Sequence, residues 1–348
     1  MSAEGQESSP PLPQGRRLAL VVGVNGQPVP GRDSLQYAVD DGQDIAQVLQ
    51  QPSCAFTLFR PLRLGEQATS TRIKDDVRDL ANALQEDDFA LFFFSGHAEA
   101  LPIEANMDEV YLITDDFDTA RAQRDKERDV SLSWLRQMLF EHEKIQNILI
   151  ILDCCYAGKF ADSAPDPYLD ALQQRLRYYF GEPSAQKSPS RAGGIRLALT
   201  AIGDSTAKEQ DGHGLLTGHI LAALKGECEQ AIDERGQVTF TSLFGALTKA
   251  IPEQPPRFFG AGNDLLLATH PHLSIQARRE RERAKQQTQR TQRLHMKYSK
   301  RSPEKAGERS SFLMDWLTAP PRSCSVASHV HTVSMLASGA VHANLFVW

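Results

Sequence analysis

Two short motifs each place a reactive side chain directly after an apolar run. His97 closes the motif S-G-H after the run 89–94, and Cys155 closes the motif D-C-C after the run 145–152. A thiol becomes an effective nucleophile when a neighbouring base takes its proton, and an imidazole titrates in the range that this requires. The two motifs therefore predict nucleophilic catalysis by a cysteine, provided that the fold brings them together.

The elements that must position these motifs alternate along the chain. Short apolar runs, rich in β-branched or aromatic residues, predict strands buried on both faces, and apolar residues at helical spacing predict helices. The expected strands are 18–24, 56–64, 89–94, 145–152, 195–201 and a last apolar stretch at 265–268. The expected helices are 34–49, 71–84, 131–140, 215–224 and 240–251, the first of them capped by Asp33 or Ser34.

Strands that alternate with helices favour right-handed crossovers and a mostly parallel sheet covered on both sides. Active sites of such sheets form at the carboxyl ends of the strands. If the third and fourth strands are neighbours, His97 and Cys155 lie at one edge of the sheet. The small residues Gly96, Ala98, Ala157 and Gly158 let backbone N–H groups approach a substrate carbonyl. We expect the N–H groups of Gly96, Ala98 and Cys155 to stabilise the oxyanion.

Composition narrows the class of protein. The 348 residues are 41% hydrophobic and 24% charged, with a net charge of -6, which is typical of a globular protein and gives no reason to expect nucleic acid as a partner. The sequence contains neither an apolar window of membrane-spanning length nor a signal peptide. Five cysteines form no disulfide framework, which favours a reducing, cytoplasmic setting. Metal-ligand spacings of the C-x-x-C or H-x-x-x-H kind are absent from the sequence, so we expect no metal site.

Several segments fall outside this pattern. Residues 1–16 lack apolar periodicity and are expected to be disordered. The polar stretch 161–193 reads as an exposed insertion. The segment 278–309 holds 12 basic and 4 acidic residues, which indicates a solvated helix or disorder, or a docking segment for an acidic partner. The tail from 310 fits no element.

The pair of motifs resembles the signatures of the caspase and metacaspase superfamily, with S-G-H and D-x-C-x-x-G 58 residues apart. Further similar stretches are LALVVGVN, SLQYAVDDGQDIAQVL, YLITDD and IRLALTAIGDSTAKEQDGHGLLTGHILAAL. The resemblance covers about residues 17–270 and is nearest to the prokaryotic metacaspase-like branch. It implies a caspase-like three-layer α/β/α sandwich with a mostly parallel central sheet. The parts it implies are a large-subunit-like part 17–160, a linker 161–193, a small-subunit-like part 194–270 and a tail 271–348.

The resemblance also assigns roles. It implies that His97 is the general base and that Cys155, rather than Cys154, is the nucleophile. Asp153 matches the acid that lines the S1 pocket of metacaspases and selects arginine or lysine before the scissile bond. Asp41 matches a second pocket carboxylate, for which Asp40 competes, and Ser95 matches a serine at the pocket edge. Two partly desolvated carboxylates would favour a cationic side chain over an acidic one, which argues against cleavage after aspartate.

Two departures from the family pattern stand beside these matches. Ala98 replaces the usual glycine after the histidine, but its N–H is kept. Tyr156-Ala157 replaces a frequent His-Ser pair, which leaves the branch open. Some metacaspases are activated by calcium, but the acidic loop Asp115, Asp116 and Asp118 lacks a calcium-loop spacing, so we expect no required cofactor.

The remaining candidate residues have structural interpretations. Free cysteines are usually small buried hydrophobes, and His213 and His219 are read as non-catalytic. The other cysteines are Cys54, Cys154, Cys228 and Cys324.

The leading hypothesis is a cysteine endopeptidase that acts on polypeptides after Arg or Lys. It would process itself in the 161–193 loop, which carries Arg175, Arg177, Lys187 and Arg191. The alternatives are a caspase-fold scaffold or signalling module that binds partners without turnover, and a cysteine hydrolase with another pocket preference.

Overall fold

The computed structural model divides the chain into two compact units, residues 1–282 and 283–348. It describes residues 15–27, 33–104, 107–125, 127–140, 142, 145, 147–156, 195–201, 209–252, 255–261 and 264–299. The expected lead-in up to residue 14, the whole 161–193 insertion and the tail beyond Ser299 lie outside the described residues.

A central sheet of eight strands dominates the first unit within the described part of the chain. Its main path runs β11-β7-β6-β4-β1-β2, with β3 on β1 and β5 on β4. Every pair is parallel except β4 with β5 and β7 with β11. The strands are β1 Arg17–Gly23, β2 Thr57–Leu58, β3 Arg63–Leu64, β4 Phe89–Glu104, β5 Met107–Leu112, β6 Asn147–Tyr156, β7 Ile195–Thr200 and β11 Arg257–Ala261.

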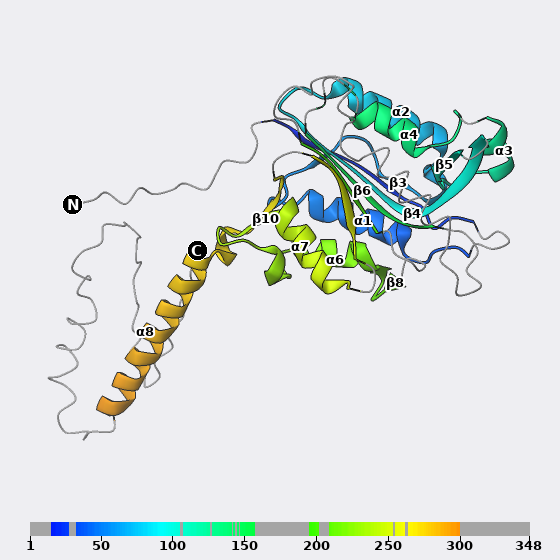
Figure 1. The fold of residues 1–348 in the computed structure, drawn as a ribbon. Helices are drawn as coiled ribbons and strands as arrows, with labels where there is room; N and C mark the ends of the chain where they lie inside the picture. Colours follow the sequence, from blue (N-terminus) through cyan, green and yellow to red (C-terminus); the bar gives the residue numbers. More distant parts are fainter. Residues whose placement is uncertain are drawn as a thin grey trace. The chain divides into compact units, whose positions relative to one another are not determined.

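Helices cover both faces of this sheet (Figure 1). One face carries α2 (Ser70–Ala83) and α4 (Leu132–Leu135), and α4 continues into a π-helical turn at Arg136–Phe140. The other face carries α1 (Ala38–Leu49), α6 (Leu215–Leu224) and α7 (Phe240–Ala250). The short helix α3 (Thr119–Arg124) lies beside β5. The expected three-layer α/β/α sandwich with a mostly parallel sheet is confirmed.

Successive side chains of the central strands pack into two different hydrophobic clusters, one on each face of the sheet. In β4, Phe92 and Phe94 pack into the cluster that contains α2 and α4, whereas Leu91 and Phe93 pack into the one that contains α1, α6 and α7. Because successive side chains of a strand point to opposite faces, a strand between two helical layers must be apolar at every position. The continuous apolar runs of the sequence reflect this requirement.

Smaller elements complete the described part. β8 (Glu209–Gln210) and β9 (His213–Gly214) form a hairpin, and β10 (Gln237–Thr239) pairs with β12 (Leu266–Thr269). Short 3-10 turns lie at Gly65–Gln67, Glu229–Ala231 and Pro271–Leu273. The described part of the basic run, for which the sequence left helix and disorder open, lies in the helix α8 (Ile275–Ser299), and residues 300–309 lie outside the described part.

The start of α1 differs from the prediction. The helix begins at Ala38, and neither Asp33 nor Ser34 caps it. Instead the Glu209 carboxylate accepts hydrogen bonds from the N–H groups of Gln36 (2.8 Å) and Tyr37 (2.9 Å). A carboxylate next to free N–H groups at a helix start is stabilising, and here it comes from a distant hairpin.

Two strand boundaries also differ. The predicted strand 56–64 is interrupted and forms the separate short strands β2 and β3. The predicted strand 89–94 continues to Glu104, because its second half pairs with β5, which was not predicted. His97 therefore lies inside a long strand, where the strand passes from the parallel sheet into an antiparallel hairpin.

Candidate active site

The two predicted catalytic residues lie on neighbouring strands. β4 and β6 pair in parallel over ten positions, and His97 is the register partner of Cys155. Neighbouring strands lie about 4.8 Å apart, so the two backbones are as close as strands allow. Gly96 and Ala98 flank His97 and pair with Cys154 and Tyr156. The assignment of their N–H groups to an oxyanion hole stays a prediction.

The imidazole of His97 is buried and oriented by a backbone carbonyl. Its Nε2 atom lies 2.9 Å from the carbonyl oxygen of Asp33, and the residue is 5% exposed. Because a carbonyl oxygen can only accept, Nε2 of the neutral ring must carry the hydrogen. The lone pair then lies on Nδ1, which is the atom that can take a proton from a nucleophile.

Backbone hydrogen bonds fix the strand on either side of this histidine. Ile113 donates its N–H to the carbonyl oxygen of His97 (2.9 Å), and Val24 donates to that of Ser95 (2.9 Å). The first bond ties His97 to the segment after β5 and the second ties the strand to the end of β1. The backbone at His97 is thus held from the β5 side and from the β1 side of the strand.

Asp41 on α1 is buried beside the same strand. Its Oδ2 atom accepts from the Ser95 hydroxyl at 2.9 Å, its Oδ1 lies 3.0 Å from His213 Nδ1, and the Gly214 N–H donates to both oxygens at 3.2 Å. The residue is 1% exposed. Burial raises its pKa, and these hydrogen bonds oppose that effect.

Asp153 is the second buried carboxylate. Its Oδ2 atom accepts from the N–H of Thr217 at 3.0 Å and from the hydroxyl of Thr217 at 2.5 Å. Burial, together with the nearby charge of Asp41, raises the pKa of Asp153 to about 6, although the hydrogen bonds from Thr217 lower it. A Cβ atom at Gly214 would lie 2.6 Å from Asp153 Oδ2 and 3.0 Å from Asp41 Oδ2, so the two carboxylates meet at this glycine. We call Asp41 and Asp153 the acidic pair.

Burial distinguishes Asp41 from Asp40 and shows where the remaining described cysteines lie. Asp40 is exposed, so Asp41 is the residue that joins Asp153 and Ser95. Cys154 and Cys54 are buried in the hydrophobic clusters, as expected for structural cysteines, and Cys228 is half-buried against one cluster. Within the described residues, no cluster of histidine, cysteine and acidic side chains could hold a metal ion.

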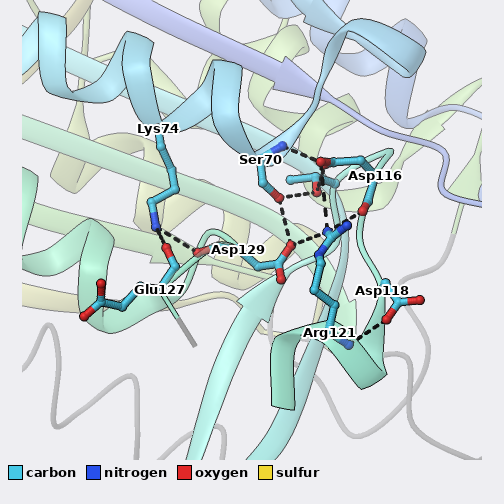
Figure 2. Close-up of polar contacts among 8 residues, drawn as sticks. Ser70, Lys74, Asp116, Asp118, Arg121, Glu127 and Asp129 are labelled. Atoms are coloured by element: carbon cyan, nitrogen blue, oxygen red, sulfur yellow. Dashed lines mark hydrogen bonds and ion pairs between the residues drawn. The ribbon is translucent and has the colours of Figure 1, made fainter. Parts of the chain in front are cut away.

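The acidic loop after β5 is occupied by basic side chains of the protein. Figure 2 shows Arg121 between Asp116 and Asp129, beside Ser70 on α2. Arg121 Nη2 lies 2.8 Å from Asp129 Oδ1 and also donates to the carbonyl oxygen of Asp116. Asp118 caps α3 by accepting from the Arg121 N–H. Arg121 therefore connects Asp116, near the start of this loop, to Asp129, near its end, through non-covalent contacts.

The N-terminus of α2 anchors the same loop. Ser70 donates its N–H to Asp116 Oδ1 at 2.7 Å and its hydroxyl to Asp129 Oδ1 at 3.0 Å. Lys74, one turn further along α2, donates to the carbonyl oxygens of Glu127 and Asp129. The pKa of Asp116 is lowered although burial opposes it, because hydrogen bonds from Ser70 and Thr114 favour its charged form, as does the nearby charge of Arg121.

Four of these contacts were not predicted from the sequence. The Asp33 carbonyl is a backbone atom and carries no side-chain signature. Thr217, His213 and Glu209 lie 64, 172 and 172 or more residues along the chain from the groups that they contact. A weak signal existed for the hairpin, since Asp211-Gly212 is a typical two-residue turn.

Comparison with known protein families gave a match over part of the chain. The family model described as "Metacaspase, peptidase C14 domain" matches residues 17–164, which include both His97 and Cys155. This part of the chain is therefore similar to the caspase and metacaspase superfamily. The fold is accordingly caspase-like, and the family is one of cysteine peptidases that act on polypeptides.

Solved structures of related shape were also found. Protein GSU0716 from Geobacter sulfurreducens is 17% identical, with a TM-score of 0.49 over 75% of this chain and 99% of that one. Caspase-1 from Spodoptera frugiperda is 12% identical, with a TM-score of 0.42 over 74% of this chain and 90% of that one. Comparison with curated proteins gave no match. Within the described residues, every helix is too short or too polar to cross a bilayer.

Proposed function

We propose that this caspase-like domain is a cysteine endopeptidase with a Cys155–His97 dyad that cleaves after arginine or lysine. One observation carries the proposal: His97 and Cys155, 58 residues apart in the sequence, are register partners on adjacent parallel strands. The family match supports the peptidase class. The acidic pair, with Asp41 on α1 and Asp153 on β6, supports the preference for a basic substrate side chain.

The chemistry follows from the dyad. His97 Nδ1 takes the thiol proton of Cys155, and the thiolate attacks the scissile carbonyl carbon, so that a C–S bond forms and the carbonyl oxygen becomes an oxyanion. When the intermediate collapses, the C–N bond breaks and the imidazolium gives its proton to the leaving amine. Water, deprotonated by His97, then hydrolyses the thioester and restores the thiol.

Substrate preference rests on the acidic pair. Two carboxylates at one position repel each other, and a guanidinium or ammonium group between them would relieve this repulsion while donating charge-assisted hydrogen bonds to both. Ser95, which donates to Asp41, would fix the orientation of the first carboxylate. An aspartate side chain in the same place would add a third negative charge, so peptides with aspartate before the cut should not be turned over.

A panel of fluorogenic peptides that differ only in the residue before the cut tests this proposal. We expect turnover with Arg and Lys, none with Asp, and a loss of at least about 10³-fold in kcat for Cys155→Ala and His97→Ala. Cys154→Ala is the matched control, since it alters the neighbouring buried cysteine. Turnover after Asp would refute the specificity, and a complete lack of turnover would favour a binding scaffold.

We propose further that no metal ion is required. The acidic loop at Asp115, Asp116 and Asp118 is the one calcium candidate that the sequence offered, and Arg121 already supplies a positive charge there. The peptide panel should therefore give the same kcat/KM in chelator and in millimolar calcium. A calcium requirement would contradict this part of the proposal.

Autoprocessing is proposed for the 161–193 loop, which lies outside the described residues. Its basic residues Arg175, Arg177, Lys187 and Arg191 are candidate cleavage points for an enzyme with this preference. Intact mass spectrometry should show cleavage of the wild-type chain at one of them and a single uncut chain for Cys155→Ala. A fully active, uncut wild-type chain would refute autoprocessing.

Two further expectations belong to the proposal. A reducing, cytoplasmic setting would keep the Cys155 thiol available.

The basic helix α8, with six more basic than acidic residues in Ile275–Ser299, is proposed to dock an acidic partner. Binding of an acidic peptide that falls steeply with salt, and is lost when residues 283–348 are removed, would support the docking role.

A further inference from the structure

His213 occupies a position that the dyad chemistry leaves unexplained. It stands on β9 with Nδ1 3.0 Å from Asp41 Oδ1 and Nε2 3.5 Å from Asp44 Oδ2. Its side chain is 23% exposed, whereas that of Asp41 is 1% exposed. The imidazole therefore bridges a buried carboxylate and a half-exposed one of the same helix.

The hairpin that carries His213 is held firmly over the acidic pair. Its turn, Asp211-Gly212, has φ values of 54° and 89°, as a tight two-residue hairpin turn requires. Glu209 on β8 binds the start of α1, and the Gly214 N–H on β9 donates to Asp41. Both strands of the hairpin thus contact the helix that supplies Asp41, and His213 has little freedom to leave it.

Among the described residues, the charged side chains that contact His213 are the two carboxylates of Asp41 and Asp44. Asp41 and Asp44 face it from α1, Asp153 lies behind Asp41 on β6, and Glu209 lies on the paired strand β8. From α6 it meets Gly218, where a Cβ would lie 3.6 Å from the His213 Cβ. Of the described side chains that contact Asp41, only His213 can gain a positive charge. A positive charge on His213 would offset part of the negative charge of Asp41, to which a basic substrate side chain is proposed to bind.

We propose that His213 is a specificity-determining residue, whose protonation withdraws Asp41 from a basic substrate side chain. The inference rests on the proposed function, because it assumes that the acidic pair binds this side chain. A neutral His213 donates one hydrogen bond and leaves the negative charge of Asp41 available. A charged His213 forms an ion pair with Asp41, and the substrate must then compete with a cation held inside the protein.

A purely structural role of His213 predicts a different pH dependence of KM. If His213 merely supported the hairpin, then an asparagine that keeps a donor near the position of Nδ1 would reproduce its behaviour at every pH. If His213 acts through its charge, the two side chains must diverge as the pH falls, because an asparagine cannot be protonated. The divergence should appear in KM, since the charge acts on binding of the side chain and not on the dyad.

The test compares KM for an Arg peptide across pH for the wild-type enzyme, His213→Asn and, as matched control, His219→Asn. His219 is a half-buried histidine of α6. Between about pH 8 and about pH 5.5, KM of the wild type should rise about tenfold more than KM of His213→Asn, because only the wild-type side chain can gain a charge that competes with the substrate. The control should follow the wild type. The rate of Cys155 alkylation by iodoacetamide should be the same in all three within about twofold.

Asp44→Asn provides a second variant in case His213→Asn fails to fold. Asp44→Asn removes a carboxylate that lies next to the His213 imidazole and favours its charged form. KM of this variant should therefore rise less than KM of the wild type as the pH falls. Parallel KM profiles for wild type, His213→Asn and Asp44→Asn would overturn the inference while leaving the peptidase intact. Absence of turnover with every peptide would instead overturn the proposed function, and this inference with it.

Discussion

Asp153 is the residue at which stability and proposed function conflict most directly. Burial and the nearby Asp41 disfavour its charged form, so that its pKa is raised to about 6. A raised pKa in the folded state means that the fold binds a proton more tightly than the unfolded chain does. Its contribution to stability is therefore full below the ordinary value of 3.8 and is lost as the pH rises through about 6. At neutral pH the ionised carboxylate costs stability.

Asp153→Asn should remove this cost. An asparagine can still accept from the N–H of Thr217, so the variant is expected to be more stable than the wild type at pH 8 by roughly 3 kcal/mol, with the difference vanishing toward pH 4. Thermal unfolding across pH measures it. The same variant should lose most of its kcat/KM for Arg and Lys peptides. Asp44→Asn, at a half-exposed carboxylate, should change the stability little, and an unchanged Asp153→Asn melting profile would contradict the argument.

At the scale of elements, the segment between β5 and α4 connects the dyad to α2. Ile113 in this segment donates to the His97 carbonyl, and Asp116, three residues later, is held by Ser70 and Arg121. Asp129 at the far end is fully buried, and among the described residues only the cation Arg121 forms an ion pair with its carboxylate, since Lys74 contacts its backbone carbonyl. Arg121 therefore holds both ends of the segment, and through Ile113 it supports the strand position of His97.

Arg121→Met should loosen this segment. Removing one partner of a buried ion pair leaves Asp129 uncompensated, which typically costs about 3 kcal/mol. Faster hydrogen exchange at the Ile113 amide, with a lower kcat and little change in KM, is the expected signature. Arg78→Met serves as control, since Arg78 forms an exposed pair with Asp75 that should contribute less than about 1 kcal/mol. Exchange at Ile113 that stays as slow as in the control would argue against the connection.

The elements also show how far the sequence could predict the site. Apolar runs ending in S-G-H and D-C-C located His97 and Cys155, because strand identity is a local property of the chain. The helix α1 was recognised from its spacing, but its cap was assigned to nearby residues, whereas Glu209 supplies it. Contacts such as His213 with Asp41 depend on how two distant elements pack, and periodicity within either element carries no information about this.

At the scale of the molecule, the two sides of the 161–193 insertion form one core. β6 precedes the insertion and β7 follows it, yet they are adjacent parallel strands of one sheet. One hydrophobic cluster combines α1 with α6 and α7. Arg17 at the start of β1 donates to the carbonyl oxygens of Leu266 and Leu267 at 2.9 Å, and its guanidinium stacks on Phe56. Burial lowers the pKa of Arg17 to about 10.

A cut within the insertion should therefore leave the two parts associated. A protease site placed between residues 161 and 193 of Cys155→Ala, and cleaved by an added protease, separates the cut from the protein's own activity. We expect the cut protein to elute in size-exclusion chromatography with the mass of the intact 38.6 kDa chain, and to separate only in denaturant. The reason is that dissociation would expose both the β6–β7 edge and the apolar faces of α1 and α6, which no short loop could compensate. Dissociation under native conditions would mean that the covalent connection, and not the shared core, holds the sheet together.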